Sequence, residues 1–241
     1  MRLMTGDIVK KFWLTSVAVG LATTSAYAAD PVLVVPVPDI EVVEVEEAAG
    51  PTFTISQLFG RDDDVWFSRT DAEVEFSLSD ALGIAINGYG AVAFDDPAEG
   101  EVGIGAKLFG EFGNATVGVF TGLAWELPDG DRFFHLGAEV EFEFEPVEIG
   151  IEVARIWENG APEAFELEIE AGVAVGERVT LLAGVGFEWE GGPPPEITIG
   201  AGLEVALTDH FALQAAVERV IDDSWSFGVG FILTFGGGDD D

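Results

Sequence analysis

Residues 137–174 read GAEVEFEFEPVEIGIEVARIWENGAPEAFELEIEAGVA, and through this stretch glutamate alternates with apolar residues. Successive side chains of a β-strand point to opposite faces, so each of the three strand-length segments has one acidic face and one apolar face. The sequence therefore predicts amphipathic strands, and the fold depends on which face meets water.

The same period of two continues from Thr52 almost to the end of the chain. It predicts a meander of twelve strands, at 52–60, 70–78, 82–94, 101–112, 115–126, 132–144, 147–157, 164–174, 178–189, 196–206, 210–219 and 225–235. Tight turns are expected to alternate with longer polar connections at 61–69, 95–100, 127–131, 158–163, 190–195 and 220–224. Residues 52–60 have the weakest pattern, which leaves ten strands as the alternative.

The N-terminal segment has the features of a secretory signal. Arg2, Lys10 and Lys11 precede an apolar run over 12–22, and the small residues of Ala26-Tyr27-Ala28 predict cleavage after Ala28. The apolar run is shorter than the roughly 20 residues of a membrane-spanning helix. We therefore predict a signal peptide at 1–28, a Pro/Val/Glu-rich periplasmic linker at 29–51, a barrel at 52–235 and an acidic tail at 236–241.

Composition excludes several functional classes. The chain has 45 Asp and Glu against 10 Lys and Arg, a net charge of −35, so it lacks the basic patches that bind nucleic acid. Because 48% of the residues are hydrophobic, the chain is not expected to be disordered. It has no cysteine, which excludes disulfides, thiolate metal sites and cysteine nucleophiles.

Aromatic residues are sorted to the strand ends. The five tryptophans beyond the signal all lie beside the longer connections: Trp66, Trp125, Trp157, Trp189 and Trp225. A second aromatic row marks the tight-turn end: Phe53, Phe112, Phe144, Phe211 and Phe235. Two aromatic girdles separated by an apolar band are typical of a barrel that crosses both interfaces of a bilayer.

Three features indicate that the acidic face lines the lumen, rather than the outside of a soluble exported barrel. Twelve strands leave an interior wider than the filled core of an eight-stranded barrel. Glycines such as Gly103, Gly118 and Gly184 share the acidic parity, and small residues suit a concave wall. The apolar rows are continuous, with Arg155 and Arg219 on the apolar face only near strand ends, where long side chains reach the interface. The prediction is an all-β, transmembrane, antiparallel up-and-down β-barrel.

These residues resemble the outer-membrane β-barrel and porin-like proteins of Gram-negative bacteria, particularly those of alphaproteobacteria. The resemblance covers the signal, the acidic Pro/Val segment, the amphipathic meander and a last strand of alternating aromatics that ends at Phe235. It implies short periplasmic turns, a place in the lipid of the cell outer membrane, and assembly by the barrel-assembly machinery.

The lumen would then carry an acidic wall. The predicted pore-lining residues are Glu73, Glu75, Glu139, Glu141, Glu143, Glu148, Glu152, Glu166, Glu168, Glu170, Glu188 and Glu204. Lys107 is expected to be the only lumen-facing base within the strands. Acidic rings concentrate cations, so the predicted function is a channel for passive diffusion of small cations or cationic solutes. The alternative is a non-conducting structural or surface-interaction barrel.

No enzyme, cofactor or metal site is predicted. The two histidines, His135 and His210, are expected at opposite rims, which separates them from any shared nucleophile. The aspartate runs at 62–64 and 95–96 lack the spaced ligands of a defined calcium loop.

Overall fold

The computed structural model describes residues 50–79, 81–94, 99–128, 130–191 and 194–236. The expected signal peptide, most of the linker and the acidic tail lie outside these residues. The described chain forms twelve strands: β1 (Thr52–Asp62), β2 (Val65–Ser79), β3 (Leu82–Ala93), β4 (Glu99–Glu111), β5 (Ala115–Leu127), β6 (Arg132–Phe144), β7 (Val147–Glu158), β8 (Ala161–Ala174), β9 (Val179–Glu190), β10 (Glu196–Thr208), β11 (Phe211–Val220) and β12 (Trp225–Gly236).

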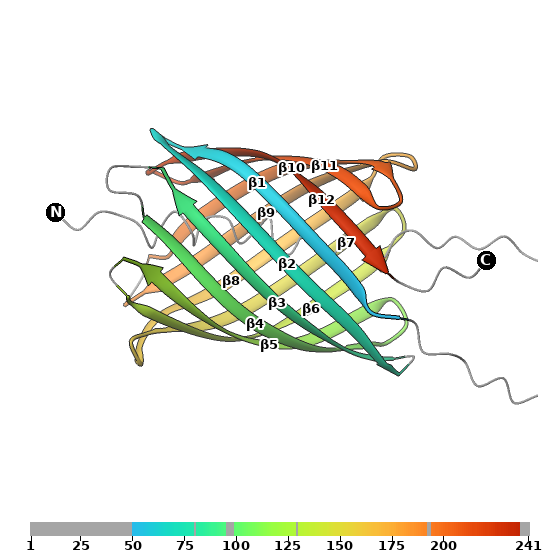
Figure 1. Cartoon of the computed structure of the whole chain (residues 1–241), viewed down its shortest axis with the longest axis horizontal. Coiled ribbons are helices and arrows are strands. Elements are labelled where there is room, and N and C mark those ends of the chain that lie inside the picture. The colour runs from blue at the N-terminus through green and yellow to red at the C-terminus, as the bar shows by residue number, and fades with distance from the viewer. Residues whose placement is uncertain (1–49, 80, 95–98, 129, 192–193, 237–241) are drawn as a thin grey trace, which may run out of the picture.

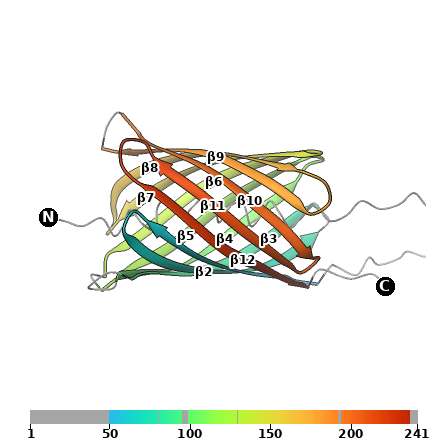
Figure 2. The same cartoon turned by 90° about the horizontal axis from the view of Figure 1, so that it is seen from above.

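The strands close into a single up-and-down barrel. Each strand pairs antiparallel with its sequence neighbours, and β1 closes the ring by pairing with β12 as well as β2. Figures 1 and 2 show the strands tilted to the barrel axis, as closure of a sheet requires. The expected fold is confirmed, and β1, the segment with the weakest pattern, is the strand that completes it.

The two ends of the barrel differ in their connections. The loop end carries the connections that follow β1, β3, β5, β7, β9 and β11, namely those at 63–64, 94–98, 128–131, 159–160, 191–195 and 221–224. The turn end carries those at 80–81, 112–114, 145–146, 175–178 and 209–210, together with the start of β1 and the end of β12.

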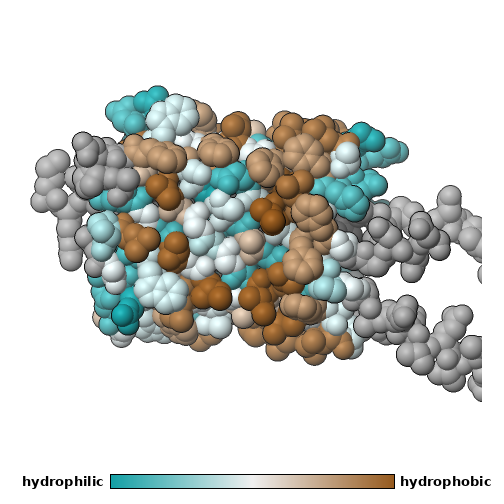
Figure 3. All heavy atoms as spheres, viewed as in Figure 1, coloured by the Kyte–Doolittle hydropathy of each residue, from teal (hydrophilic) through white to brown (hydrophobic). Residues whose placement is uncertain are grey.

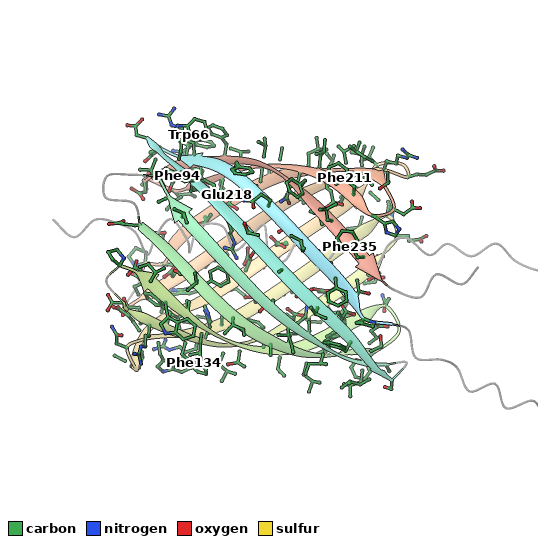
Figure 4. All side chains as sticks on the ribbon, viewed as in Figure 1. Trp66, Phe94, Phe134, Phe211, Glu218 and Phe235 are labelled. Carbon is green, nitrogen blue, oxygen red and sulfur yellow. The ribbon has the colours of Figure 1, made fainter. Side chains whose placement is uncertain are left out.

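The apolar face points outward and the acidic face inward. On β11 the side chain of Glu218 is 3% exposed, whereas the adjacent Val217 is 41% exposed; on β8 Glu170 is 7% and Ile169 36% exposed. Figure 3 shows apolar side chains spread over the outer face, and Figure 4 shows Glu218 within the barrel. A water-soluble protein of this size would bury these large apolar side chains instead.

Two connections predicted to be long are tight turns. Residues 61–69 are largely strand, with only Asp63 and Asp64 between β1 and β2, and the connection at 158–163 reduces to Asn159 and Gly160. Asn159 and Gly160 both have positive φ, 49° and 86°, which is the conformation of a two-residue hairpin turn. Polar residues made both segments look like loops, although Asn-Gly is itself a strong hairpin signal.

The outer face is not apolar throughout. Over β1 to β3 its middle carries Gln57, Ser68 and Thr70 beside the small residues Gly88 and Gly90, which matches the paler zone between the apolar patches in Figure 3. The Gln57 amide donates to Ser68 Oγ at 2.9 Å and to the Arg69 carbonyl at 2.8 Å, and Thr70 Oγ1 donates to Gln57 Oε1. These polar atoms are therefore hydrogen-bonded within the sheet.

Candidate functional site

Strand register places the inner glutamates in rows. Glu152 lies directly opposite Glu139 on one side and Glu168 on the other, across β6, β7 and β8. A second row crosses β8, β9 and β10, where Glu188 lies opposite both Glu166 and Glu196. We call these the two carboxylate rows. Facing side chains on a sheet lie about 5 Å apart, and ionised carboxylates at that distance repel by roughly 0.2–1 kcal/mol per pair. Each row thus concentrates acidic side chains on the inner wall.

Lys107 of β4 is held against this wall. Its Nζ lies 2.9 Å from Oε1 of Glu139 on β6, so the ion pair spans the intervening strand β5. Gly118 of β5 leaves the space for it, because a Cβ there would lie within 3 Å of the Glu139 side chain. The backbone of β5 thus lets a base from one strand neutralise an acid two strands away.

A second base faces the lumen, contrary to the expectation that Lys107 is the only one. Arg69 was assigned to a long connection, but it belongs to β2 and is 5% exposed. Its Nη2 lies 2.7 Å from Oδ1 of Asp71, and its guanidinium lies 4.7 Å from the centre of the Tyr89 ring. Tyr89 in turn donates a hydrogen bond to Glu101. Arg69 is followed at every second position by Asp71, Glu73 and Glu75, and this alternation could have predicted that Arg69 faces the lumen.

Tyr89 lies flat against the wall because Gly103 of β4 has no side chain beneath the ring. Phe120 lies over Gly137 and Phe109 over Gly83 in the same manner. Each of these glycines is on the inner face, directly opposite the aromatic residue whose ring covers it. The inner glycines therefore let large side chains fold back onto the wall instead of crossing the lumen.

The inner wall borders two cavities. The larger, about 130 Å³, is lined from the predicted set by Glu73, Glu139, Glu141 and Glu152, together with Arg69 and Lys107. The smaller, about 30 Å³, lies between β8 and β11 and is lined by Glu170, Gln214 and Glu218. The structure thus brings five of the twelve predicted pore-lining residues to these cavities.

The other predicted glutamates lie elsewhere on the inner face. Glu166, Glu168 and Glu188 belong to the carboxylate rows, toward the loop end. The rest lie closer to the turn end: Glu75, Glu143, Glu148 and Glu204. Residues outside the predicted list complete the polar lining, above all Arg69, Tyr89, Glu101 and Glu218.

The tryptophans of the proposed girdle all lie at the loop end, within two residues of the end of a strand: Trp66 in β2, Trp125 in β5, Trp157 in β7, Trp189 in β9 and Trp225 in β12. Trp66 and Trp225 are more than half exposed. Figure 4 shows Trp66, Phe94 and Phe134 at one end of the barrel and Phe211 and Phe235 at the other. Aromatic side chains thus mark both ends of the apolar outer surface.

The two histidines of the described residues lie at opposite ends of the barrel. His135 is buried on the inner face of β6 near the loop end, whereas His210 lies in the tight turn between β10 and β11 at the opposite end. Within the described ranges, no three His, Asp or Glu side chains gather in a way that could hold a metal ion. No helix in this part of the chain is long and apolar enough to cross a membrane.

No protein-family model and no curated protein matches the chain by sequence. Solved structures match its fold. The KdgM porin in complex with disordered oligogalacturonate is 11% identical, with a TM-score of 0.59, over 76% of this chain and 99% of that one. The NanC porin is 8% identical, with a TM-score of 0.62, over 74% and 98%.

A third similar structure is the outer membrane phospholipase of Salmonella typhi, a dimer with bound calcium. It is 13% identical, with a TM-score of 0.55, over 75% of this chain and 90% of that one. At such identities the likeness concerns the fold. The chain therefore has the closed β-barrel fold that these porins and this outer-membrane phospholipase share.

Proposed function

We propose that this protein is a porin-like channel of the outer membrane, through which small solutes diffuse passively and cations are preferred. The fold is that of porins, and the exposed apolar surface bounded by aromatic side chains suits a bilayer. The secretory signal at 1–28 and cleavage after Ala28 belong to the same proposal, since an outer-membrane protein must be exported.

The preference for cations is supported by one observation, the excess of acidic over basic side chains on the described inner wall. Among the described residues, the inward-facing bases are Arg69 and Lys107, and each is already paired with a carboxylate. Lys107 is paired with Glu139 of the first carboxylate row, and neither row has a Lys or Arg among its facing residues. Rings of fixed acidic charge raise the local concentration of cations and lower that of anions.

Charge distinguishes this barrel from a porin of similar fold. The KdgM porin is described in complex with oligogalacturonate, which is a polyanion. Carboxylate rows would repel such a ligand, because the like charges meet in a confined space. We therefore expect cationic or neutral solutes to pass through this channel and acidic oligosaccharides to be excluded.

Planar-bilayer recordings in a potassium chloride gradient test the proposal. We expect single-channel steps and a reversal potential of the sign set by potassium. The double variant Glu152→Gln/Glu168→Gln, which removes two charges from one row, should move the reversal potential toward zero. Glu177→Gln, in an exposed turn between β8 and β9, is the matched control and should leave it unchanged.

Two results would contradict the proposal. A reversal potential set by chloride would refute the preference for cations. Correctly folded protein that inserts into the bilayer without conductance would favour the non-conducting structural barrel instead. The heat-modifiable gel mobility of the purified protein establishes that the barrel is folded in either case.

A further inference from the structure

Basic residues are scarce in this chain and unevenly placed. Three of the ten precede residue 50, which leaves seven in the described residues. Arg69 and Lys107 face the lumen, and Arg178 lies in a connection at the turn end. The remaining four all lie near the loop end: Arg61, Arg132, Arg155 and Arg219. A chain with a net charge of −35 thus places most of its described bases at one end.

All four of these arginines face outward. Arg61 shares the parity of the exposed Phe59 on β1, and Arg155 that of the exposed Val153 on β7. Arg132 follows the parity of Phe134 on β6, and Arg219 that of Val217 on β11. They therefore stand on the apolar outer surface, at its loop-end border.

Each outward arginine lies directly opposite an aromatic residue on the neighbouring strand, on the same face of the sheet. The pairs are Arg61 with Trp66, Arg132 with Trp125, Arg155 with Phe165, and Arg219 with Trp225. In two of them the guanidinium lies close to the ring, 5.8 Å from its centre for Arg61 and 4.9 Å for Arg219. The same two-residue unit thus recurs on four strand pairs around the barrel; we call it the arginine–aromatic ring.

Three of these guanidiniums have no acid partner within the described chain. Arg61 lies 2.7 Å from Asp64, whose side chain is almost fully exposed. For Arg132, Arg155 and Arg219, no carboxylate of the described residues lies within ion-pair distance. In a protein this rich in acids, guanidiniums left without a carboxylate at three similar places are positioned for an anion from outside.

We propose that the arginine–aromatic ring binds phosphate-bearing anionic lipid headgroups of the leaflet that surrounds the loop end. The inference rests on the membrane placement in the proposed function. In this arrangement the aromatic side chain lies at the boundary of the acyl chains, and the guanidinium of the facing arginine binds a phosphate through two parallel hydrogen bonds. With a single base in the described connections of the turn end, the two leaflets would be bound unequally.

Lipid-dependent stability tests the inference. The full-length protein in non-ionic detergent is titrated with phosphatidic acid, and its unfolding temperature is followed. We expect the temperature to rise, and the triple variant Arg132→Gln/Arg155→Gln/Arg219→Gln to lose most of that rise. At about 1 kcal/mol per charge, the apparent affinity for the lipid should fall roughly 100-fold. Arg178→Gln, at the opposite end, is the matched control and should keep the full rise.

A second triple variant controls for the possibility that the first one misfolds. Replacing the same three arginines by lysine preserves charge and removes the planar fork, so it should retain an intermediate rise. An equal rise in the wild type and both triple variants would refute the ring as the binding site, as would no rise at all. Inorganic phosphate at equal concentration separates the sources of the anion: an equal rise with it would refute a lipid headgroup as the ligand.

The two proposals fail separately. The arginines face away from the lumen, so the triple variant should keep the cation preference in bilayer recordings. Loss of lipid dependence with an intact channel would contradict only the ring, and a folded barrel that binds lipid without conductance would contradict only the channel. Recovery of the protein in buffer without detergent would contradict the membrane placement that both require.

Discussion

The ion pair between Lys107 and Glu139 offers the sharpest test of the inner wall. We consider Lys107→Met, Glu139→Gln and the double variant, with the free energy of unfolding measured by urea titration in lipid vesicles. Charges 2.9 Å apart attract by about 1.4 kcal/mol in bulk water and by about 6 kcal/mol at an effective dielectric of 20. The side chains are 23% and 9% exposed, so we expect a coupling energy of about 2 kcal/mol after screening by water and salt.

The two single variants should differ. Lys107→Met leaves Glu139 without a counter-charge and directly opposite Glu152, so repulsion adds to the lost attraction. Glu139→Gln relieves the repulsion with Glu152, and Lys107 still interacts electrostatically with Glu141 and Glu73. We therefore expect Lys107→Met to be the more destabilising of the two and Glu139→Gln to rescue part of its loss.

A double-mutant cycle built from these variants measures the coupling energy between Lys107 and Glu139. A coupling energy below about 0.5 kcal/mol, within the usual error of additivity, would refute the claim that Lys107 neutralises Glu139. The coupling should also decrease as the salt concentration rises, because the lumen admits ions. In bilayer recordings Lys107→Met should strengthen the preference for cations, since it removes one of the two inward-facing bases of the described residues.

Three further outcomes are expected. Gly118→Ala places a methyl group against the Glu139 side chain and should lower the coupling energy measured in the same cycle; an unchanged coupling would show that the pair does not need this space. Gly160→Ala, at a φ of 86°, should lower the free energy of unfolding by about 1 kcal/mol, and full stability would refute the left-handed turn. In cell fractionation the protein should be extracted from outer membranes only with detergent; release by buffer alone would count against the apolar face lying in lipid.

Much of the architecture was predictable from local pattern. Alternation with period two places Glu139, Glu141 and Glu143 on one face whatever the strand pairs with, and β6 and β7 have almost the predicted bounds. Prediction was poorest where polar side chains continue a strand. Arg69 was taken for a loop residue because its charge resembles loop composition, while its position on the inner face of β2 makes it part of the wall.

The pairing register of the strands could not be predicted from the sequence. Shifting a strand by two residues keeps each side chain on the same face of the sheet but gives it a different partner on the neighbouring strand. Only the closed barrel shows that Glu139, Glu152 and Glu168 stand side by side, or that Lys107 reaches Glu139 across Gly118. The same holds for the pairing of each outward arginine with an aromatic residue. These contacts join residues on different strands, so they exist only once the ring has closed.

The alternation of glutamate and apolar residues by itself determined that each strand has two chemically opposed faces, because side-chain direction in a strand is a local property of the backbone. The tertiary structure decided how those faces are used. Pairing of β1 with β12 closes the sheet, and closure is what separates one acidic interior from one apolar exterior. It also fixes which charges meet, since register is a property of neighbouring strands and not of any strand alone.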